Sequence, residues 1–181
     1  TIRAKLGGGL RYRAASREEL PAVGDWVLAR MIGGGEAMIM MVFSRRSMLA
    51  RQAAGERTDL QIIAANVDTI FIVTSMNQEF EPRRLERYML AVWESGANPV
   101  IVLNKRDLAD DPEHYEEMAE QVAAGAPVVS LSALEGPGAL TTWLKPGKTI
   151  ALVGSSGVGK STIINALAGR ELMATGGIRE D

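Results

Sequence analysis

The stretch GSSGVGKST, from Gly154 to Thr162, restricts what this 181-residue chain can fold into more than any other stretch. It fits the pattern G-x-x-x-x-G-K-[ST] at every fixed position. The glycines let consecutive backbone N–H groups turn toward phosphate oxygens, Lys160 brings a positive charge to the β- and γ-phosphates, and the Ser161 hydroxyl can ligate Mg²⁺. An apolar run precedes the loop and a helical pattern follows it, as this mechanism requires. The predicted phosphate-binding residues are Gly154, Ser155, Ser156, Gly157, Val158, Gly159, Lys160, Ser161 and Thr162, with Ser161 also the predicted Mg²⁺ ligand.

A second motif, NKRD at Asn104 to Asp107, is suited to reading a purine base. The Asp107 carboxylate can accept hydrogen bonds from both the N1–H and the 2-amino group of guanine. Adenine offers neither donor, so the carboxylate would be left unpaired, at a cost of several kcal/mol. Asn104 can bond guanine O6 or N7, and Lys105 can lay its alkyl stem over the purine face. Arg106 is expected to point to solvent, and the motif as a whole predicts guanine specificity.

Apolar runs rich in Ile and Val alternate with helical patterns from residue 67 onward. This alternation predicts a parallel α/β sheet with strands at 68–75, 99–104, 127–133 and 148–154, and helices opening at Pro82, Pro112 and Lys160. Ligands bind at the carboxyl ends of such strands. The NKRD and SLSAL stretches each follow a strand, so Ser132 and the backbone N–H of Ala133 are predicted to meet guanine O6.

The first third of the chain has a different character. Short β patterns, IRAKL, LRYRAA, GDWVLARMI and EAMIMMVF, are separated by glycine turns, which favours a small barrel or sandwich. The polar stretch at 44–59 is predicted to be a loop. Residues 1–66 carry 10 Lys and Arg against 6 Asp and Glu, whereas residues 67–181 carry 10 against 16. We therefore predict two domains, 1–66 and 67–181, the first with an anionic partner or with ordinary surface charge.

Composition excludes several classes. Apolar residues make up 46 %, enough for a core, so a disordered chain is excluded. There is no cysteine, which excludes disulfides and thiolate-bound metal and fits a reducing compartment. No apolar run approaches the roughly 20 residues of a membrane span. The first residue is Thr1, and the last, Asp181, falls in a polar stretch soon after a helix, so we expect a piece of a longer protein.

The order of the motifs is reversed relative to Ras-like GTPases, in which the phosphate loop comes first. The chain therefore resembles a circularly permuted GTPase. With a β-rich domain in front, it is similar to the RsgA (YjeQ) family of ribosome-assembly GTPases over nearly its whole length. The resemblance rests on VGDWV, RRSMLAR, AANVDTIFIVTS, LERYMLAVWESG, VIVLNKRDL, VSALEG, LVGSSGVGKSTIINAL and TGGIRED.

This resemblance implies an OB-fold at 1–66 that binds RNA and the ribosome, and a partial, permuted GTPase domain at 67–181. It implies hydrolysis of GTP to GDP and phosphate with Mg²⁺, stimulated by the 30S subunit, in late maturation of that subunit in the cytoplasm. The family's DxxG motif and its C-terminal zinc domain are not found in these 181 residues. We expect a monomer that contacts 16S rRNA, and no membrane association.

An OB-fold with a basic surface suggests which side chains meet RNA. The candidates for rRNA phosphates are Arg11, Arg13, Arg45, Arg46 and Arg51. Tyr12, Trp26 and Phe43 are the aromatic side chains available for base stacking, although core packing is the favoured interpretation for them.

Two alternatives to a GTPase stay open at this point. One is an ATPase with the same phosphate loop, and the other is an RNA-binding module in which nucleotide is bound but not hydrolysed. No residue is assigned as the catalytic or water-positioning group. We therefore expect residues 1–181 to bind GDP or GTP weakly and to turn GTP over poorly.

Overall fold

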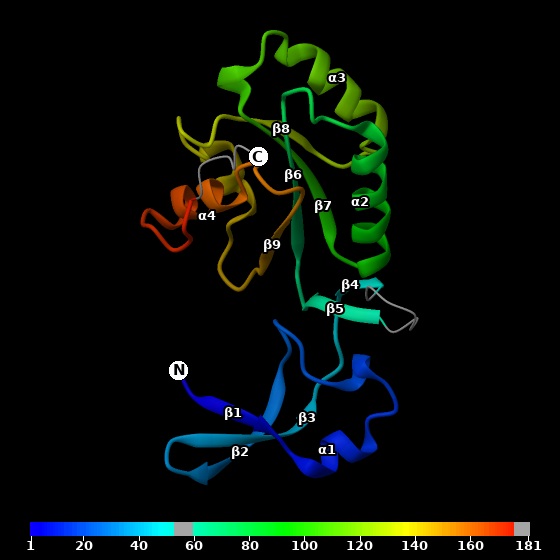
Figure 1. Cartoon of the computed structure of the whole chain (residues 1–181), viewed down its shortest axis with the longest axis vertical. Helices are drawn as coiled ribbons and strands as arrows, with labels where there is room; N and C mark the ends of the chain where they lie inside the picture. The colour runs from blue at the N-terminus through cyan, green and yellow to red at the C-terminus, as the bar shows by residue number, and fades with distance from the viewer. Residues whose placement is uncertain (53–59, 176–181) are drawn as a thin grey trace, which may run out of the picture. The chain divides into compact units, whose positions relative to one another are not determined.

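The computed structural model describes residues 1–52 and 60–175, which divide into two compact units (Figure 1). The N-terminal unit is Thr1–Val67 and the C-terminal unit is Asp68–Asp181. Within the described ranges, no helix is both long enough and apolar enough to span a lipid bilayer.

The C-terminal unit is built on a four-stranded parallel sheet with the strand order β8-β7-β6-β9. Its strands are β6 (Thr69–Ser75), β7 (Asn98–Asn104), β8 (Val128–Ser130) and β9 (Ile150–Val153). Its helices are α2 (Pro82–Ser95), α3 (Pro112–Val122) and α4 (Lys160–Ala168), with 3₁₀ turns η2 (Arg106–Leu108) and η3 (Gly138–Trp143). The predicted parallel α/β architecture is confirmed.

The apolar runs form strands because both faces of the sheet are covered. Phe71, Val73, Val100 and Val102 belong to one buried cluster with Leu140 of η3 and Ile163 of α4. Side chains alternate along a strand, so the residues between them point to the other face, where α2 and α3 lie (Figure 1). Those inner residues are also fully buried: Ile70, Ile72, Ile101 and Leu103.

The helices begin at the predicted residues Pro82, Pro112 and Lys160. Pro82 and Pro112 occupy the first turn of α2 and α3, where a missing N–H costs nothing. The Asp111 carboxylate caps α3 by accepting the His114 N–H. Gly96 ends α2 with φ of 80°, in the left-handed region.

The strand order reverses direction at β6. The chain runs from β6 through β7 to β8 on one side and then returns to place β9 on the other side of β6. In an open parallel sheet, the carboxyl ends of the strands flanking such a reversal form the natural ligand crevice. The loop after β9 is the GSSGVGKST stretch, so the fold brings it to this crevice.

The N-terminal unit contains two small sheets in the order β1-β3-β2 and β4-β5. Its elements are β1 (Arg3–Leu6), α1 (Gly8–Arg13), η1 (Arg17–Glu19), β2 (Val27–Gly33), β3 (Glu36–Val42), β4 (Met48–Gln52) and β5 (Leu60–Ala65). Among residues 1–52 and 60–67 these sheets do not close into a barrel, so the OB-fold expectation is not confirmed. The unit is nevertheless rich in strands.

Two local expectations in this unit are wrong. LRYRAA was expected to be a strand, but residues 8–13 form helix α1, and its Tyr12 side chain is 91 % exposed. The Leu-Arg-Tyr-Arg alternation therefore reflects no buried face. The stretch 44–59 was expected to be a loop, but Met48–Gln52 forms β4, in which Leu49 is buried. Residues 53–59 lie outside the described residues.

Candidate functional site

Asn104 joins the three predicted motifs. It is the last residue of β7 and only 3 % exposed. Its side-chain Nδ2 donates to the carbonyl of Val158 in the phosphate loop at 2.9 Å, and its Oδ1 accepts the N–H of Ala133 at 3.0 Å. A single buried amide thus ties the ends of β7, β8 and β9 together at one edge of the sheet.

Two positions of the phosphate loop require glycine for two reasons: the backbone has a positive φ, and a neighbouring atom lies where a Cβ would be. A Cβ on Gly154, at φ of 144°, would lie 2.1 Å from the carbonyl oxygen of Val73. A Cβ on Gly159, at φ of 97°, would lie 2.2 Å from Asn104 Nδ2. Any other residue at Gly159 would therefore push away the amide that links the loop to the base motif.

Lys160 begins α4 with its side chain turned back over the phosphate loop. Its ammonium donates to the carbonyls of Gly154 and Ser155, and burial lowers the pKa of this group. Ser161 and Thr162 follow in the first turn of α4 and are half-buried, while Ser156 and Gly157 are exposed at the loop's tip. A helix N-terminus, a lysine and a glycine-rich loop together form a site suited to phosphate.

The NKRD motif, which is predicted to contact the purine base, begins at the last residue of β7 and continues into a tight turn. Lys105 has φ of 64°, and residues 106–108 form η2, which presents Asp107 to solvent. The Arg106 N–H donates to the carbonyl of Leu131 at 3.2 Å, so the turn is fixed to the segment that follows β8. The Arg106 side chain is exposed and lies 3.6 Å from Glu116 of α3.

Ser132 and Ala133 lie beside Asn104. The Ser132 residue is 4 % exposed, and its Oγ has no hydrogen-bond partner among the described residues. A buried hydroxyl without a partner fits a site that completes its hydrogen bonds with a ligand. The Ala133 N–H, predicted to meet guanine O6, donates to Asn104 Oδ1 in this structure. Guanine O6 would have to share this donor with Asn104.

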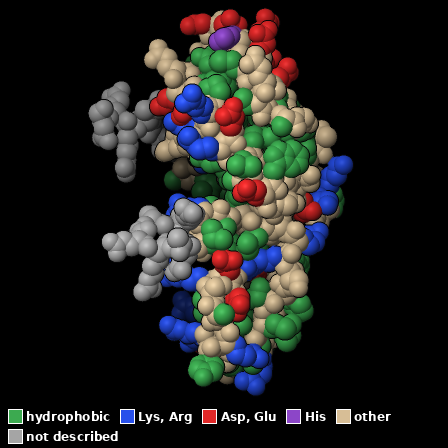
Figure 2. Space-filling model, turned by 90° about the vertical axis from the view of Figure 1, so that its right-hand side faces the viewer, with side chains coloured by type: hydrophobic (Ala, Val, Ile, Leu, Met, Phe, Trp, Pro, Cys, Tyr) green, Lys and Arg blue, Asp and Glu red, His purple; other side chains and the backbone are tan. Residues whose placement is uncertain are grey.

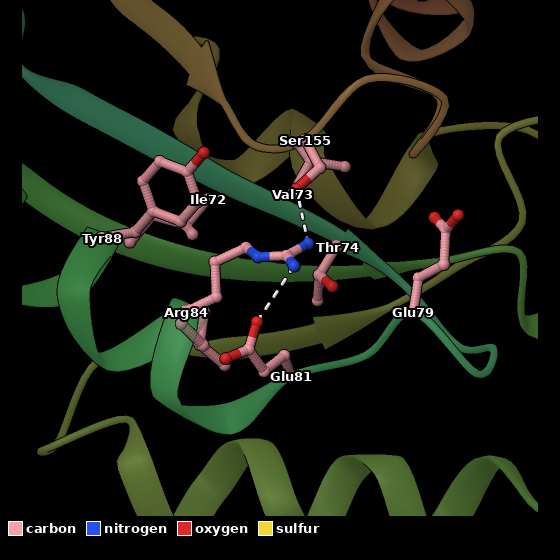
Figure 3. Close-up of a pocket in the computed structure, with 9 residues that line it drawn as sticks. Ile72, Val73, Thr74, Glu79, Glu81, Arg84, Tyr88 and Ser155 are labelled. Carbon is pink, nitrogen blue, oxygen red and sulfur yellow. Dashed lines mark hydrogen bonds and ion pairs between the residues drawn. The ribbon is translucent and has the colours of Figure 1, made fainter.

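Sequence reasoning missed Arg84, which reaches the phosphate loop from α2 (Figure 3). Its Nη1 donates to the Ser155 Oγ at 3.0 Å, and its Nη2 pairs with Glu81 at 2.9 Å. No motif contains it. The available signal was positional, because Arg84 lies in the first turn of the helix after β6, and β6 is the neighbour of β9.

The residues present fit a magnesium ion held largely by a nucleotide. Among the described residues, there is no group of three or more His, Cys, Asp and Glu side chains that could bind a metal by itself. Mg²⁺ in phosphate-loop sites needs few protein ligands, because phosphate oxygens and waters complete its shell. The Ser161 hydroxyl in the first turn of α4 is the ligand that this arrangement offers.

The five arginines of the N-terminal unit proposed to bind RNA differ in their surroundings. Arg45 is 14 % exposed and pairs with Asp25, which is 1 % exposed, through two bonds of 2.7 Å. It also donates to the carbonyls of Glu18 and Leu20 and to the Met48 sulfur. All five guanidinium N–H groups thus have acceptors within the unit.

The remaining arginines and aromatic residues lie on the surface. Arg11 and Arg13 are exposed in the last turn of α1, Arg46 is exposed, and Arg51 is exposed in β4 beside Gln61. The aromatic side chains are not core residues, because Tyr12 is 91 %, Trp26 70 % and Phe43 48 % exposed. In Figure 2, acidic side chains gather around the histidine of α3 in the C-terminal unit.

A family model described as RsgA GTPase matches residues 42–181. A small ribosomal subunit biogenesis GTPase RsgA from Methanosarcina acetivorans is 52 % identical over 164 residues, covering 89 % of this chain and 44 % of that protein. RsgA 2 of Lactiplantibacillus plantarum, with the same description, is 47 % identical and covers 98 % of this chain and 51 % of that protein. The chain thus spans about half the length of these curated relatives.

Two solved structures share the fold. The crystal structure of YjeQ from Thermotoga maritima aligns with a TM-score of 0.71 and 29 % identity, covering 95 % of this chain and 59 % of that one. The crystal structure of YloQ, described as a circularly permuted GTPase, aligns with a TM-score of 0.63 and 27 % identity, covering 93 % of this chain and 56 % of that one.

Proposed function

This chain belongs to the RsgA GTPase family, and from that premise we propose that its C-terminal unit binds GDP and GTP. The observation that carries the proposal is the Asn104 amide, which bonds the phosphate loop at Val158 and the Ala133 N–H of the SLSAL stretch. Because this amide holds the two motifs side by side, a single nucleotide can place its purine near Asp107 and its diphosphate in the loop that begins at Gly154. The Ser161 hydroxyl would ligate bound Mg²⁺, and the ion would neutralise charge on the phosphates.

As part of a longer protein, we propose that the unit hydrolyses GTP to GDP and phosphate in biogenesis of the small ribosomal subunit. The names of the relatives support this proposal. The phosphate-loop N–H groups and Lys160 are suited to stabilise the negative charge that develops on the γ-phosphate. Stimulation by the 30S subunit, action late in its maturation, a monomeric state, a cytoplasmic location and a zinc site in a C-terminal domain stay predictions from the resemblance.

Competition between nucleotides tests guanine binding directly. We expect GDP to displace a fluorescent GDP analogue from residues 1–181 at a concentration about 10³-fold lower than ADP does, because Asp107 pairs only with guanine. Both competitors should be measured with and without Mg²⁺. Equal displacement by ADP would favour the ATPase alternative, and no displacement by either would contradict a nucleotide site.

We also propose that the N-terminal unit contacts 16S rRNA through its exposed basic and aromatic side chains. Its exposed Arg11, Arg13, Arg46 and Arg51, together with three exposed aromatic side chains, support this. Arg45 is better explained by its bonds within the unit. The same surface fits the alternative of an RNA-binding module that binds but does not hydrolyse nucleotide, and it does not separate that alternative from a GTPase.

Salt dependence tests the RNA proposal. Replacing both Arg11 and Arg13 by Ala should weaken rRNA binding and lower the slope of log affinity against log salt by about 2, as two phosphate contacts are lost. Arg83→Ala, an exposed arginine of α2, removes charge from the other unit and is the control. An unchanged slope in the double variant would contradict the contact.

A further inference from the structure

Arg84 connects α2 to the phosphate loop. The helix begins at Pro82, directly after the loop that follows β6, and Arg84 lies in its first turn. Figure 3 shows its guanidinium between Glu81 below and Ser155 above, with Thr74 of β6 alongside. The bond from Nη1 to the Ser155 Oγ spans 71 positions of the chain, so it is a tertiary contact and not a local one.

Ser155 is held from two sides. Its hydroxyl accepts a hydrogen bond from Arg84, and its backbone carbonyl accepts one from the Lys160 ammonium. Ser155 is the second residue of the loop and follows Gly154, whose φ of 144° only glycine adopts readily. The peptide at the start of the loop is therefore fixed by a side chain of α2 and by a side chain of α4.

The geometry of the guanidinium suits this bridging role. Its two terminal nitrogens bond different partners, Nη1 the Ser155 hydroxyl and Nη2 the Glu81 carboxylate. The Arg84–Glu81 ion pair is 41 % and 42 % exposed at its two side chains, so by itself it stabilises little. The ion pair orients the planar guanidinium group so that Nη1 points toward Ser155 of the phosphate loop.

We propose that Arg84 is a positioning residue of the nucleotide site, which acts through Ser155 to hold the phosphate loop in its binding conformation. The inference rests on the proposed binding of GDP and GTP. A loop that is already ordered loses less conformational freedom when the ligand binds, so the contact increases affinity for the diphosphate that both nucleotides share. The effect should be the same for GDP and GTP.

The test is a double-mutant cycle on GDP affinity, measured by calorimetry with residues 1–181. Arg84→Ala should weaken GDP binding about fivefold, the effect expected from the loss of one ordinary, partly exposed hydrogen bond. Ser155→Ala should weaken it by a similar factor. Arg84→Ala in the Ser155→Ala background should have no further effect, because the contact is already lost. Arg84→Lys, which keeps a donor and the charge, should restore part of the affinity.

Controls separate this role from other effects. Arg83→Ala removes the same charge from the exposed side of the same turn and should leave GDP affinity unchanged. An Arg84→Ala effect of equal size with and without the Ser155 hydroxyl would mean that Arg84 acts by its charge alone, which overturns the proposal. Normal GDP binding by Arg84→Ala would overturn it too and leave the proposed function intact. Failure of the unmodified chain to bind GDP would overturn both.

Discussion

Replacing Asp107 by Asn is expected to weaken GDP binding about 10³-fold and to improve the binding of xanthosine diphosphate. The carboxylate, exposed on η2 at the end of β7, is proposed to accept both donors of the guanine edge. An amide offers one acceptor and one donor instead. That pattern matches xanthine, which carries a carbonyl where guanine carries the 2-amino group. Competition of both nucleotides against a fluorescent analogue measures the change.

The control for this substitution is Asp110→Asn. Asp110 is exposed and lies three positions further along the same connection, so its change removes the same charge without touching the proposed base contact. It should leave GDP affinity within about twofold. If Asp107→Asn and Asp110→Asn behaved alike, Asp107 would not be the base-reading residue.

Replacing Asp25 by Asn should destabilise the N-terminal unit by about 3–5 kcal/mol at neutral pH, because it leaves the Arg45 charge buried without its partner. The Asp25 carboxylate accepts from Arg45 and from the Ala22 N–H, each at 2.7 Å. Urea-dependent hydrogen exchange, read on peptides of β3 and β5, reports the stability of this unit separately from the other.

The same pair predicts how stability depends on pH. Burial raises the pKa of Asp25, but the hydrogen bonds from Arg45 and Ala22 and the charge of Arg45 outweigh it, so the pKa lies below its ordinary value of 3.8. The carboxylate's contribution is therefore complete above that value and is lost as the pH falls through the lower, folded-state pKa. The stability gap between the unmodified unit and Asp25→Asn should shrink as the pH is lowered below 3.8.

An exposed ion pair of the same unit is the control. Lys5 pairs with Glu36 at 2.7 Å, but their side chains are 61 % and 30 % exposed. Glu36→Gln should cost less than about 1 kcal/mol. If it cost as much as Asp25→Asn, the explanation by burial would be wrong.

The C-terminal unit was predictable from sequence because its signals are local and agree with one another. Ile and Val runs between helical patterns define buried parallel strands, and Pro82, Pro112 and Gly96 mark the helix ends. Glycine is required at positions 154 and 159 of the phosphate loop, because the structure leaves no room for a Cβ at either position. Once the sheet is parallel, the carboxyl ends of its strands must meet at one edge.

The N-terminal unit was harder to predict because its signals conflict. The alternation in LRYRAA is that of a strand, yet α1 forms after Gly7, whose extended backbone bonds the carbonyl of Ile39. The role of Arg45 was missed for a related reason. A sequence shows an arginine but not the carboxylate that lies beside it, and Asp25 is 20 positions away.

The hydrogen-bond partners of individual groups in the site could not be predicted from the sequence either. Asn104 was expected to bond guanine O6 or N7, but which protein groups it bonds depends on side-chain geometry. The Ala133 N–H was assigned to guanine, whereas it bonds Asn104 in the structure. Arg84 carries no motif at all, and only its place in the first turn of α2 relates it to Ser155.

The bond between Asn104 and Val158 also bears on how the protein is made. The two residues are 54 positions apart, and the half of the site that contacts the base is synthesised first. A nascent chain that has emerged only as far as β8 has its base-reading turn but lacks β9 and α4, so it has nothing with which to hold a diphosphate. Nucleotide binding is therefore expected only after α4 has left the ribosome's exit tunnel.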